Sequence, residues 1–441
     1  MGYSGEINFD GLIGPTHNYA GLSQGNLASQ KHLNQTSNPQ AAALQGLDKM
    51  RIIMEQGIPQ GFFLPHERPN LLTLRDLGFG GTDEEVIGRV AKQDPALLKN
   101  VYSASSMWAA NAATFSPSID SYDQTIHITP ANLNTMFHRS IEPEFTKMQL
   151  QLMFGSIAKI HDPVSNISGY GDEGAANHLR VSAQHLKPGF QIFVYGNSAF
   201  ESHQGVIARQ AQEISQAVAA QHQLDPDLTL FLKQNNLAIE SGSFHNDIVS
   251  LANEEVFIFH QEAFADRVEL ERVLHHLKEH VKGFHPIEIL SADISLDDLV
   301  SSYLLNSQLI TLKNNQMMML LPEEVQNHSN CMRWLDEIKS SSPIKLIEFV
   351  DIRQSMMNGG GPACLRFKAV VNDEEFSQVN QKFLLNPKKL MDLRSLISKH
   401  YRDNLSPEDL MDIQLMEESY TFLDELTQLL DLGSIYHFQK T

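Results

Sequence analysis

One of the two cysteines of this chain lies in a loop that is suited to display a nucleophile. Cys364 belongs to the segment 358–365, NGGGPACL, and precedes the apolar run of residues 365–371. Glycine lets the backbone adopt conformations closed to other residues and approach a ligand closely. A reactive thiolate needs access and polar neighbours, which such a loop provides. The loop alone is equally consistent with a nucleophile and with a buried free cysteine beside a turn.

A second polar segment contains two adjacent carboxylates among glycines. The segment 169–178, GYGDEGAANH, includes Asp172 and Glu173 and formally contains the dinucleotide-binding pattern GxGxxG. That pattern is weak evidence here because no long buried strand precedes it and two acids would repel a pyrophosphate. The composition of the segment instead predicts that its carboxylates lie close to a cationic ligand or to a histidine. A solvated turn with a helix N-cap is the alternative.

A histidine and a carboxylate follow at the predicted entrance to a strand, in the segment 243–247, SFHND. Two residues apart on a strand, His245 and Asp247 would point to the same face. That arrangement suits a general acid/base and a ligand-holding anion in one pocket. A structural histidine is the alternative reading of the same segment.

The N-terminal segment 11–26, GLIGPTHNYAGLSQGN, combines four glycines with hydroxyl and amide side chains. Long polar loops of this kind are commonly binding loops, although an irregular surface loop has the same composition. Three other features predict no site. His276 and His280 lack the glutamate placement of HExxH and indicate a solvated helix face, while Cys331 and the run 317–319, MMM, indicate packed core residues.

The elements that must position these residues repeat along the chain. Strands are predicted at 247–251 and 255–260, a helix at about 263–282, and a strand at 287–290. The same pattern returns with strands at 309–312 and 316–321, a helix at about 323–339, and a strand at 344–350. Two β-β-α-β units about sixty residues apart indicate an α/β fold built from repeated modules. Helices are also predicted at 39–57, 205–221 and 407–432, and strands at 61–64 and 191–195.

Composition restricts the class of protein. The 441 residues are 42% hydrophobic and 20% charged, which is typical of a soluble globular protein. A net charge of −20 argues against nucleic acid and anionic membranes as partners. The N-terminus lacks the features of a signal peptide, and no apolar stretch reaches the roughly 18–20 residues of a membrane span. Two cysteines give no disulfide framework, so a reducing, cytoplasmic location is expected.

Six segments, taken in order, closely resemble the N-succinylarginine dihydrolases: GPTHNYAGLS, SMWAANAAT, ANLNTMFHRS, GDEGAANH, FHNDI and NGGGPACLR. The resemblance runs from about Glu6 to Gln439. It implies membership of the guanidine-modifying superfamily, whose pentein fold is a five-fold pseudosymmetric α/β propeller of ββαβ modules around a central site. It also implies one catalytic domain over residues 1–441 and a homodimer.

The resemblance further implies roles for particular residues. Cys364 matches the nucleophile, His245 the general acid/base and Glu173 the third catalytic residue, with no metal and no cofactor. Asp247 matches a substrate-binding carboxylate, which together with that of Glu173 would pair with the N–H groups of a guanidinium. The other residues that match substrate contacts are Ala20, Gly21, Leu22, Ser23, Gln24, Gly25, Asn26, Leu27, Ala28, Ser29, Asn111, His138, Arg139, Arg209 and Asn358.

The implied reaction is hydrolysis of N-succinylarginine to N-succinylornithine, two ammonia and carbon dioxide in arginine catabolism. The substrate carries two carboxylates against one guanidinium, so local cations such as Arg139 and Arg209 must attract it to an acidic protein. A single-step deiminase or amidinotransferase acting on another guanidino compound is the alternative with the same chemistry. A non-catalytic guanidine-binding protein is the alternative from another class.

Overall fold

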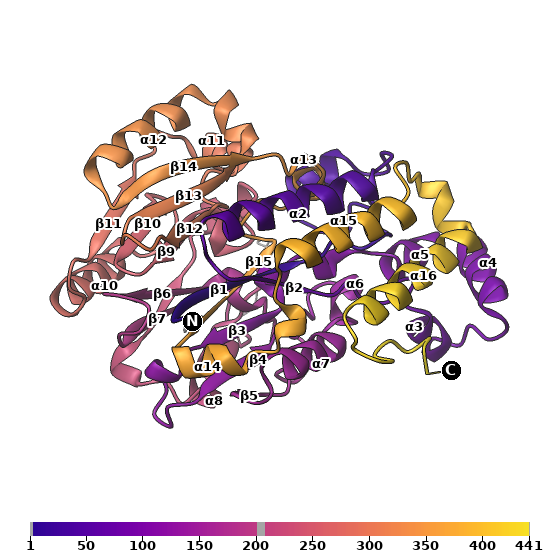
Figure 1. Cartoon of the computed structure of the whole chain (residues 1–441). Helices are drawn as coiled ribbons and strands as arrows, with labels where there is room; N and C mark the ends of the chain where they lie inside the picture. Colours follow the sequence, from indigo (N-terminus) through magenta and orange to yellow (C-terminus); the bar gives the residue numbers. More distant parts are fainter. Residues whose placement is uncertain (1–2, 201–207, 441) are drawn as a thin grey trace.

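The strands of this protein form five separate three-stranded sheets in the computed structural model, which describes residues 3–200 and 208–440 (Figure 1). In spatial order the sheets are β3 (Ala113–Ser116), β4 (Ile126–Pro130) and β5 (Ala158–Ile160); β6 (His178–Ser182), β7 (Gly189–Tyr195) and β8 (Thr229–Lys233); β9 (Ser250–Asn253), β10 (Val256–His260) and β11 (His285–Ile289); β12 (Gln308–Thr311), β13 (Met317–Pro322) and β14 (Ile344–Val350); and β15 (Arg366–Val371), β1 (Gly5–Gly11) and β2 (Gln60–Phe63).

All five sheets have the same topology. The first strand pairs antiparallel with the middle strand, and the third pairs parallel with it. A helix connects the middle strand to the third, as a parallel pairing requires. These helices are α7 (Pro143–Phe154), α8 (Gln212–Gln221), α10 (Arg267–His280), α12 (Ser329–Ser341) and α2 (Pro39–Glu55). The two modules predicted from the sequence are therefore confirmed, and the five units implied by the resemblance are present.

The fifth sheet joins the two ends of the chain. β15 comes late in the sequence and pairs with β1 over six residue pairs, from Gly5 with Val371 to Asp10 with Arg366. β1 alternates the apolar residues Ile7 and Phe9 with polar ones, as expected for a strand whose two faces differ. The ring of sheets is therefore closed by residues from both termini.

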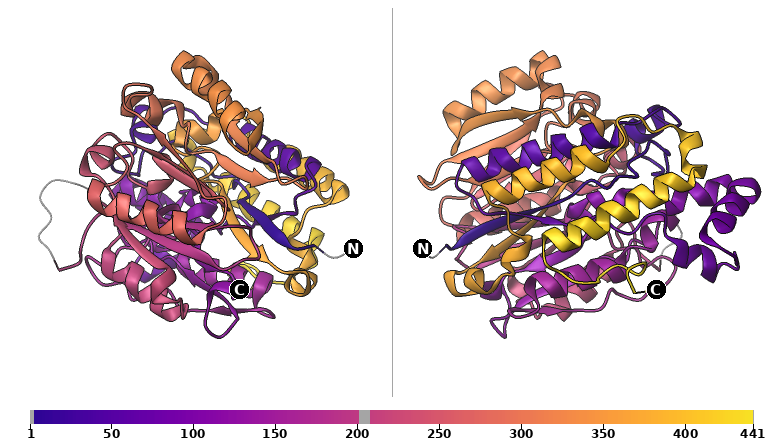
Figure 2. Two further views of the ribbon diagram at one scale, coloured as in Figure 1. Left: turned by 90° about the vertical axis from the view of Figure 1, so that its left-hand side faces the viewer. Right: turned by 45° about the vertical axis from the view of Figure 1, so that its right-hand side comes forward.

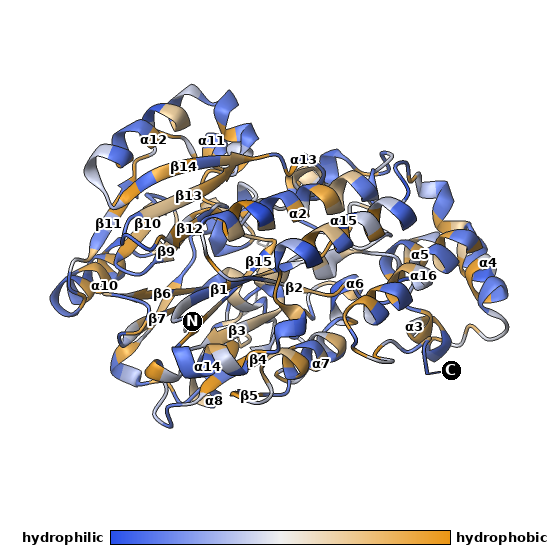
Figure 3. Ribbon diagram, viewed as in Figure 1, coloured by the Kyte–Doolittle hydropathy of each residue, from blue (hydrophilic) through white to orange (hydrophobic). Residues whose placement is uncertain are grey.

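Amphipathic helices cover the sheets. Figure 3 shows hydrophobic residues concentrated on the strands, whereas α10 and α12 carry both hydrophobic and hydrophilic residues. Beyond β15, the chain adds α14 (Asp373–Gln378), α15 (Pro387–His400) and α16 (Ile413–Leu429), and Figure 2 shows α15 lying between α2 and α16. The remaining α-helices are α1 (Leu27–Lys31), α3 (Leu71–Asp76), α4 (Asp83–Gln93), α5 (Pro95–Val101), α6 (Phe137–Ser140), α9 (Asn236–Glu240), α11 (Leu296–Ser302) and α13 (Arg353–Asn358). Among the described residues, no helix has the length and apolar character of a membrane span.

One predicted element is wrong at the residues that matter most. His245 and Asp247 do not lie on a strand, because a 3₁₀ turn, Asn246–Ile248, precedes β9. The side chain of Asn177 accepts a hydrogen bond from the backbone of Asn246, and the side chain of Asn246 accepts one from Ser250. Such local polar bonds compete with strand pairing. The predicted helix start at Gly205 lies outside the described residues, and the described helix begins at Gln212.

Candidate active site

The three predicted catalytic residues come from three different modules and occupy equivalent places in them. Glu173 lies shortly before β6, His245 shortly before β9, and Cys364 two residues before β15. These strands are the first strands of their sheets, and first strands contact one another: β6 with β9, β9 with β12, and β15 with β3. The repeated topology therefore brings together side chains that are far apart in the sequence.

The three glycines before Cys364 allow the loop to pack closely against its surroundings. α13 ends at Gly359, whose φ of 109° lies in the left-handed region that favours glycine. A Cβ atom at Gly359 would lie 2.1 Å from Nδ2 of Asn26, and one at Gly360 would lie 2.3 Å from the ring of Trp108. The nucleophile loop is thus held between the N-terminal loop and a neighbouring module.

The thiol of Cys364 is buried, with 6% of the residue exposed. Its Sγ lies 3.6 Å from Oδ2 of Asp247, to which the thiol donates, and 3.2 Å from Nδ2 of Asn306. Burial raises the pKa of Cys364 well above its usual value, and the nearby Asp247 carboxylate raises it further. Burial also raises the pKa of Asp247 to about 7. In the described part of the chain, Oδ1 of Asp247 has no hydrogen-bond partner.

Glu173 lies at the centre of a buried charge network. Its Oε2 is 2.8 Å from Nε2 of His245 and 2.8 Å from Nη1 of Arg139, while its Oε1 accepts from Thr135 at 2.9 Å. Burial opposes ionisation of Glu173, but the charge of Arg139 and the contact with His245 hold its pKa well below the usual value. Both carboxylate oxygens are therefore engaged by protein groups, and the expectation that Glu173 helps Asp247 to bind a guanidinium stays a prediction.

The hydrogen bond to Glu173 also assigns the roles of the two ring nitrogens of His245. A carboxylate accepts, so Nε2 carries the proton and Nδ1 is left as the basic atom. Burial lowers the pKa of His245 to about 4, and this outweighs the opposing contact with Glu173. His245 is therefore neutral near pH 7 and able to accept a proton at Nδ1.

Arg209 and Arg139 supply buried positive charge with unused donors. Arg209 is 2% exposed, stacks on Phe244 at 4.3 Å and donates from Nη2 to the backbone oxygen of Gln24 at 2.6 Å. Burial lowers its pKa to about 10, so it is still a cation at neutral pH. Within residues 3–200 and 208–440, Nε of Arg209 and Nε and Nη2 of Arg139 have no hydrogen-bond partner. These donors are available to anionic groups of a ligand.

The N-terminal loop encloses one side of the site. A small cavity of about 20 Å³ is lined by Ala20, Gly21, Leu22, Ser23 and Ser29 together with His138 and Asn358. This lining joins the loop to residues from two other parts of the chain, as a binding loop requires.

The other predicted contacts take different positions. Asn111 donates to the backbone oxygen of Glu173 at 2.7 Å, and Asn26 donates to that of Gly359 at 2.8 Å. Gly25 forms a turn with a φ of 86°. Leu27 and Ala28 lie on α1 and line a separate cavity on its other side.

Sequence reasoning missed several residues that complete this arrangement. Thr135 donates to Glu173, Gln210 accepts from the backbone of Glu173 at 2.7 Å, and Asn306 contacts the sulfur of Cys364. Of these, Asn306 could have been found only from its position in the repeated module. It lies two residues before β12, the first strand of its module, which is the offset of Cys364 from β15.

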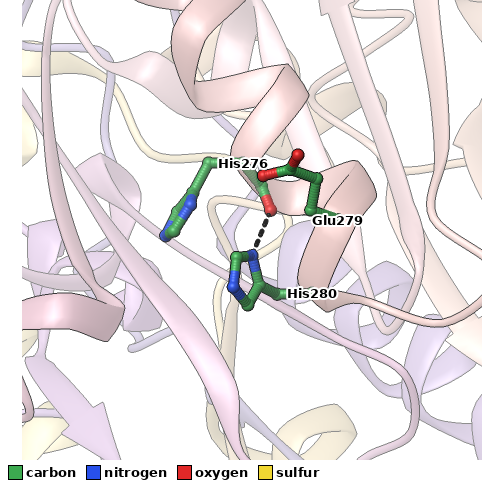
Figure 4. Close-up of side chains that lie close together, drawn as sticks. All are labelled: His276, Glu279 and His280. Atoms are coloured by element: carbon green, nitrogen blue, oxygen red, sulfur yellow. Dashed lines mark hydrogen bonds between the residues drawn. The ribbon is translucent and has the colours of Figure 1, made fainter.

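One group of described residues away from these contacts has metal-ligating side chains. His276, Glu279 and His280 lie on α10 with their ligand atoms within 4.8 Å of one another (Figure 4), and Nδ1 of His280 bonds to the backbone oxygen of His276. Glu279 and His280 are exposed, as expected for a solvated helix face. Cys331 is a buried free cysteine on α12, as predicted.

Comparison with known proteins identifies relatives over the whole chain. Residues 3–439 match the family described as succinylarginine dihydrolase. The chain is 46% identical to the N-succinylarginine dihydrolases of Idiomarina loihiensis and Shewanella sediminis, each over 444 aligned residues and 99% of both chains.

A solved structure shows the same fold at much lower sequence identity. ArgZ, an arginine dihydrolase from the ornithine-ammonia cycle in cyanobacteria, superposes with a TM-score of 0.53 at 12% identity over 83% of this chain. The match spans 41% of ArgZ. With its five ββαβ modules, the chain has the pentein fold of such enzymes.

Proposed function

This chain belongs to the succinylarginine dihydrolase family, and we propose that it hydrolyses N2-succinyl-L-arginine with two waters to N2-succinyl-L-ornithine, two ammonia and carbon dioxide. The observation that carries the proposal is the distribution of unused charge in the site. Among the residues that the structure describes, Oδ1 of Asp247, whose other oxygen contacts the thiol of Cys364, has no hydrogen-bond partner, and Arg139 and Arg209 also have donors without one. A substrate with one guanidinium and two carboxylates matches both.

Binding of the guanidinium would activate the nucleophile. Asp247 pairs with the guanidinium N–H groups, and the added positive charge lowers the pKa values of Asp247 and Cys364, which burial has raised. The thiol proton then leaves to Nδ1 of His245, which is neutral and unbonded to Glu173. The free protein therefore keeps most of the thiol protonated, and the substrate raises the fraction of thiolate.

The chemistry then proceeds in two similar cycles. Sulfur bonds to the guanidinium carbon, the protonated His245 gives its proton to the departing nitrogen, and ammonia leaves. His245 next takes a proton from water, whose oxygen replaces sulfur and yields a ureido group. A second attack at the ureido carbon releases the second ammonia, and hydrolysis of that adduct leaves a carbamate that loses carbon dioxide.

Other residues orient these groups. Glu173 holds the ring of His245 and stabilises its protonated form, while Arg139 fixes Glu173. Arg209, His138, Asn111, Asn358 and the loop 20–29 bind the rest of the substrate. From the resemblance, we further propose one catalytic domain over residues 1–441 and a cytoplasmic homodimer, for which light scattering would give twice the mass of one chain.

The test is product analysis with purified protein and N-succinylarginine. Wild type should release two ammonia for each N-succinylornithine, and Cys364→Ser should release neither. Cys331→Ser is the matched control, because it changes the other free cysteine, and it should keep turnover. One ammonia with a stable ureido product would instead indicate a single-step deiminase. Turnover by Cys364→Ser would refute the nucleophile.

A further inference from the structure

The five modules each have a polar residue at the start of the first strand, and one of these residues has no role so far. Asn111 lies two residues before β3, Asn306 two before β12 and Cys364 two before β15; Glu173 and His245 lie a little earlier in their modules. Four of the five modules thus contribute a residue with a proposed role in the reaction. The fourth module contributes Asn306.

The side chain of Asn306 contacts the nucleophile and its loop, and its Nδ2 also lies 3.4 Å from the backbone oxygen of Asp247. Its side chain is completely buried and its Nδ2 lies 3.2 Å from Sγ of Cys364. Its Oδ1 accepts from the backbone N–H of Gly361 at 2.9 Å, and its backbone oxygen accepts from Ala363 at 3.2 Å. The side-chain atom that accepts from the N–H of Gly361 must be the amide oxygen of Asn306. The atom of Asn306 that faces the sulfur is therefore its NH₂ nitrogen.

A neutral donor is what this position requires. Oδ2 of Asp247 lies 3.6 Å from Sγ of Cys364, and the negative charge of this carboxylate opposes ionisation of the thiol. A lysine or arginine in place of Asn306 would stabilise the thiolate, but it would also repel the guanidinium that must bind beside both the sulfur and the carboxylate. An amide N–H stabilises the anion without competing with the cationic substrate.

We propose that Asn306 is a further catalytic residue, whose Nδ2–H donates to the Cys364 thiolate and aims it at the guanidinium carbon. The role rests on Cys364 being the nucleophile of the proposed reaction. It holds in both cycles, because the thiolate must re-form after each adduct is hydrolysed. It also assigns a function to the close packing of Gly361, where a Cβ atom would lie 2.6 Å from Oδ1 of Asn306.

The test compares Asn306→Asp and Asn306→Ala with wild type. Asn306→Asp keeps the shape of the side chain and the oxygen that accepts from Gly361. It replaces the NH₂ group that faces the sulfur with a carboxylate oxygen. We expect kcat to fall about tenfold to a hundredfold in Asn306→Ala, the usual loss for a hydrogen bond to a charged group, and further in Asn306→Asp. KM should change much less, since Asn306 does not bind the substrate.

A second measurement needs no substrate and so separates this role from the proposed function. The rate of alkylation of Cys364 by iodoacetamide at pH 8.5, located by peptide mass spectrometry, should fall at least tenfold in Asn306→Asp. Asn253→Ala, which removes another fully buried asparagine that bonds Thr311 and Lys368, is the control and should leave alkylation unchanged. Wild-type alkylation and kcat in a folded Asn306→Asp would overturn the proposal, as would an equal loss in Asn253→Ala.

Discussion

Replacement of Asp247 by asparagine should stabilise the folded protein at alkaline pH while it removes turnover. Burial raises the pKa of Asp247 to about 7, and Oδ1 has no partner among the described residues. A group whose pKa is raised by folding supports the folded state fully below its unfolded value, here 3.8, and that support is lost as pH rises through about 7. Above that pH, folding must hold a poorly solvated negative charge.

The magnitude follows from the two pKa values. At about 1.4 kcal/mol for each pH unit between them, the full effect is about 4 kcal/mol. Asp247 keeps some contact with solvent, which screens the charge, so we expect about 2–4 kcal/mol. For a chain of this length, the melting temperature should change by about 2–4 °C.

The assay is thermal unfolding of wild type and Asp247→Asn at pH 4.5 and pH 8.5, without substrate. The variant should melt higher than wild type at pH 8.5, and the difference should largely vanish at pH 4.5. Asp403→Asn is the matched control, because Asp403 is exposed, and it should melt like wild type at both pH values. If Asp247→Asn melts lower than wild type at pH 8.5, the carboxylate is not strained in the free protein and the reasoning is wrong.

Two further substitutions test the charge network. Glu173→Gln removes the charge that holds both Arg139 and His245, so kcat should fall at least a hundredfold with an unchanged circular dichroism spectrum, and retention of a tenth of the activity would contradict the role of Glu173. Arg209→Met keeps the packing on Phe244 but removes the cation, so KM for N-succinylarginine should rise at least tenfold with a smaller change in kcat. An unchanged KM would show that Arg209 does not bind the substrate.

Local pattern predicted the modules whose parts are contiguous and regular. The sheets of β10 and β13 could be predicted from the turns at 252–254 and 313–315 and from the helices that follow them. The sheet of β1 was not predictable in this way, because its first strand is β15, at the other end of the chain. The sheet of β4 was not predicted, because its third strand, β5 (Ala158–Ile160), is too short to give a recognisable strand pattern. Pairing between distant segments has no local signal.

The candidate site was predicted as a set of residues but not as a set of contacts. Spacing placed His245 and Asp247 on one strand face. In the structure Asp247 lies in the 3₁₀ turn Asn246–Ile248, and His245 contacts Glu173 while Asp247 contacts Cys364. Asn306 gave no signal in its own segment. Its role follows from its place in the fourth module, which can be seen once the repeat is complete.

The pairing of β1 with β15 determines when a competent enzyme can exist. During synthesis, β1 leaves the ribosome early, and the edge that β15 will occupy stays open until nearly the whole chain has been made. Open strand edges invite pairing with other chains, and charged side chains pointing inward discourage it. Glu6 and Asp10 are buried charged residues of this kind, and they alternate with apolar residues along β1. Because Cys364 lies two residues before β15, a chain that lacks β15 cannot position the nucleophile, and Cys364 is the last of the proposed catalytic residues to be made.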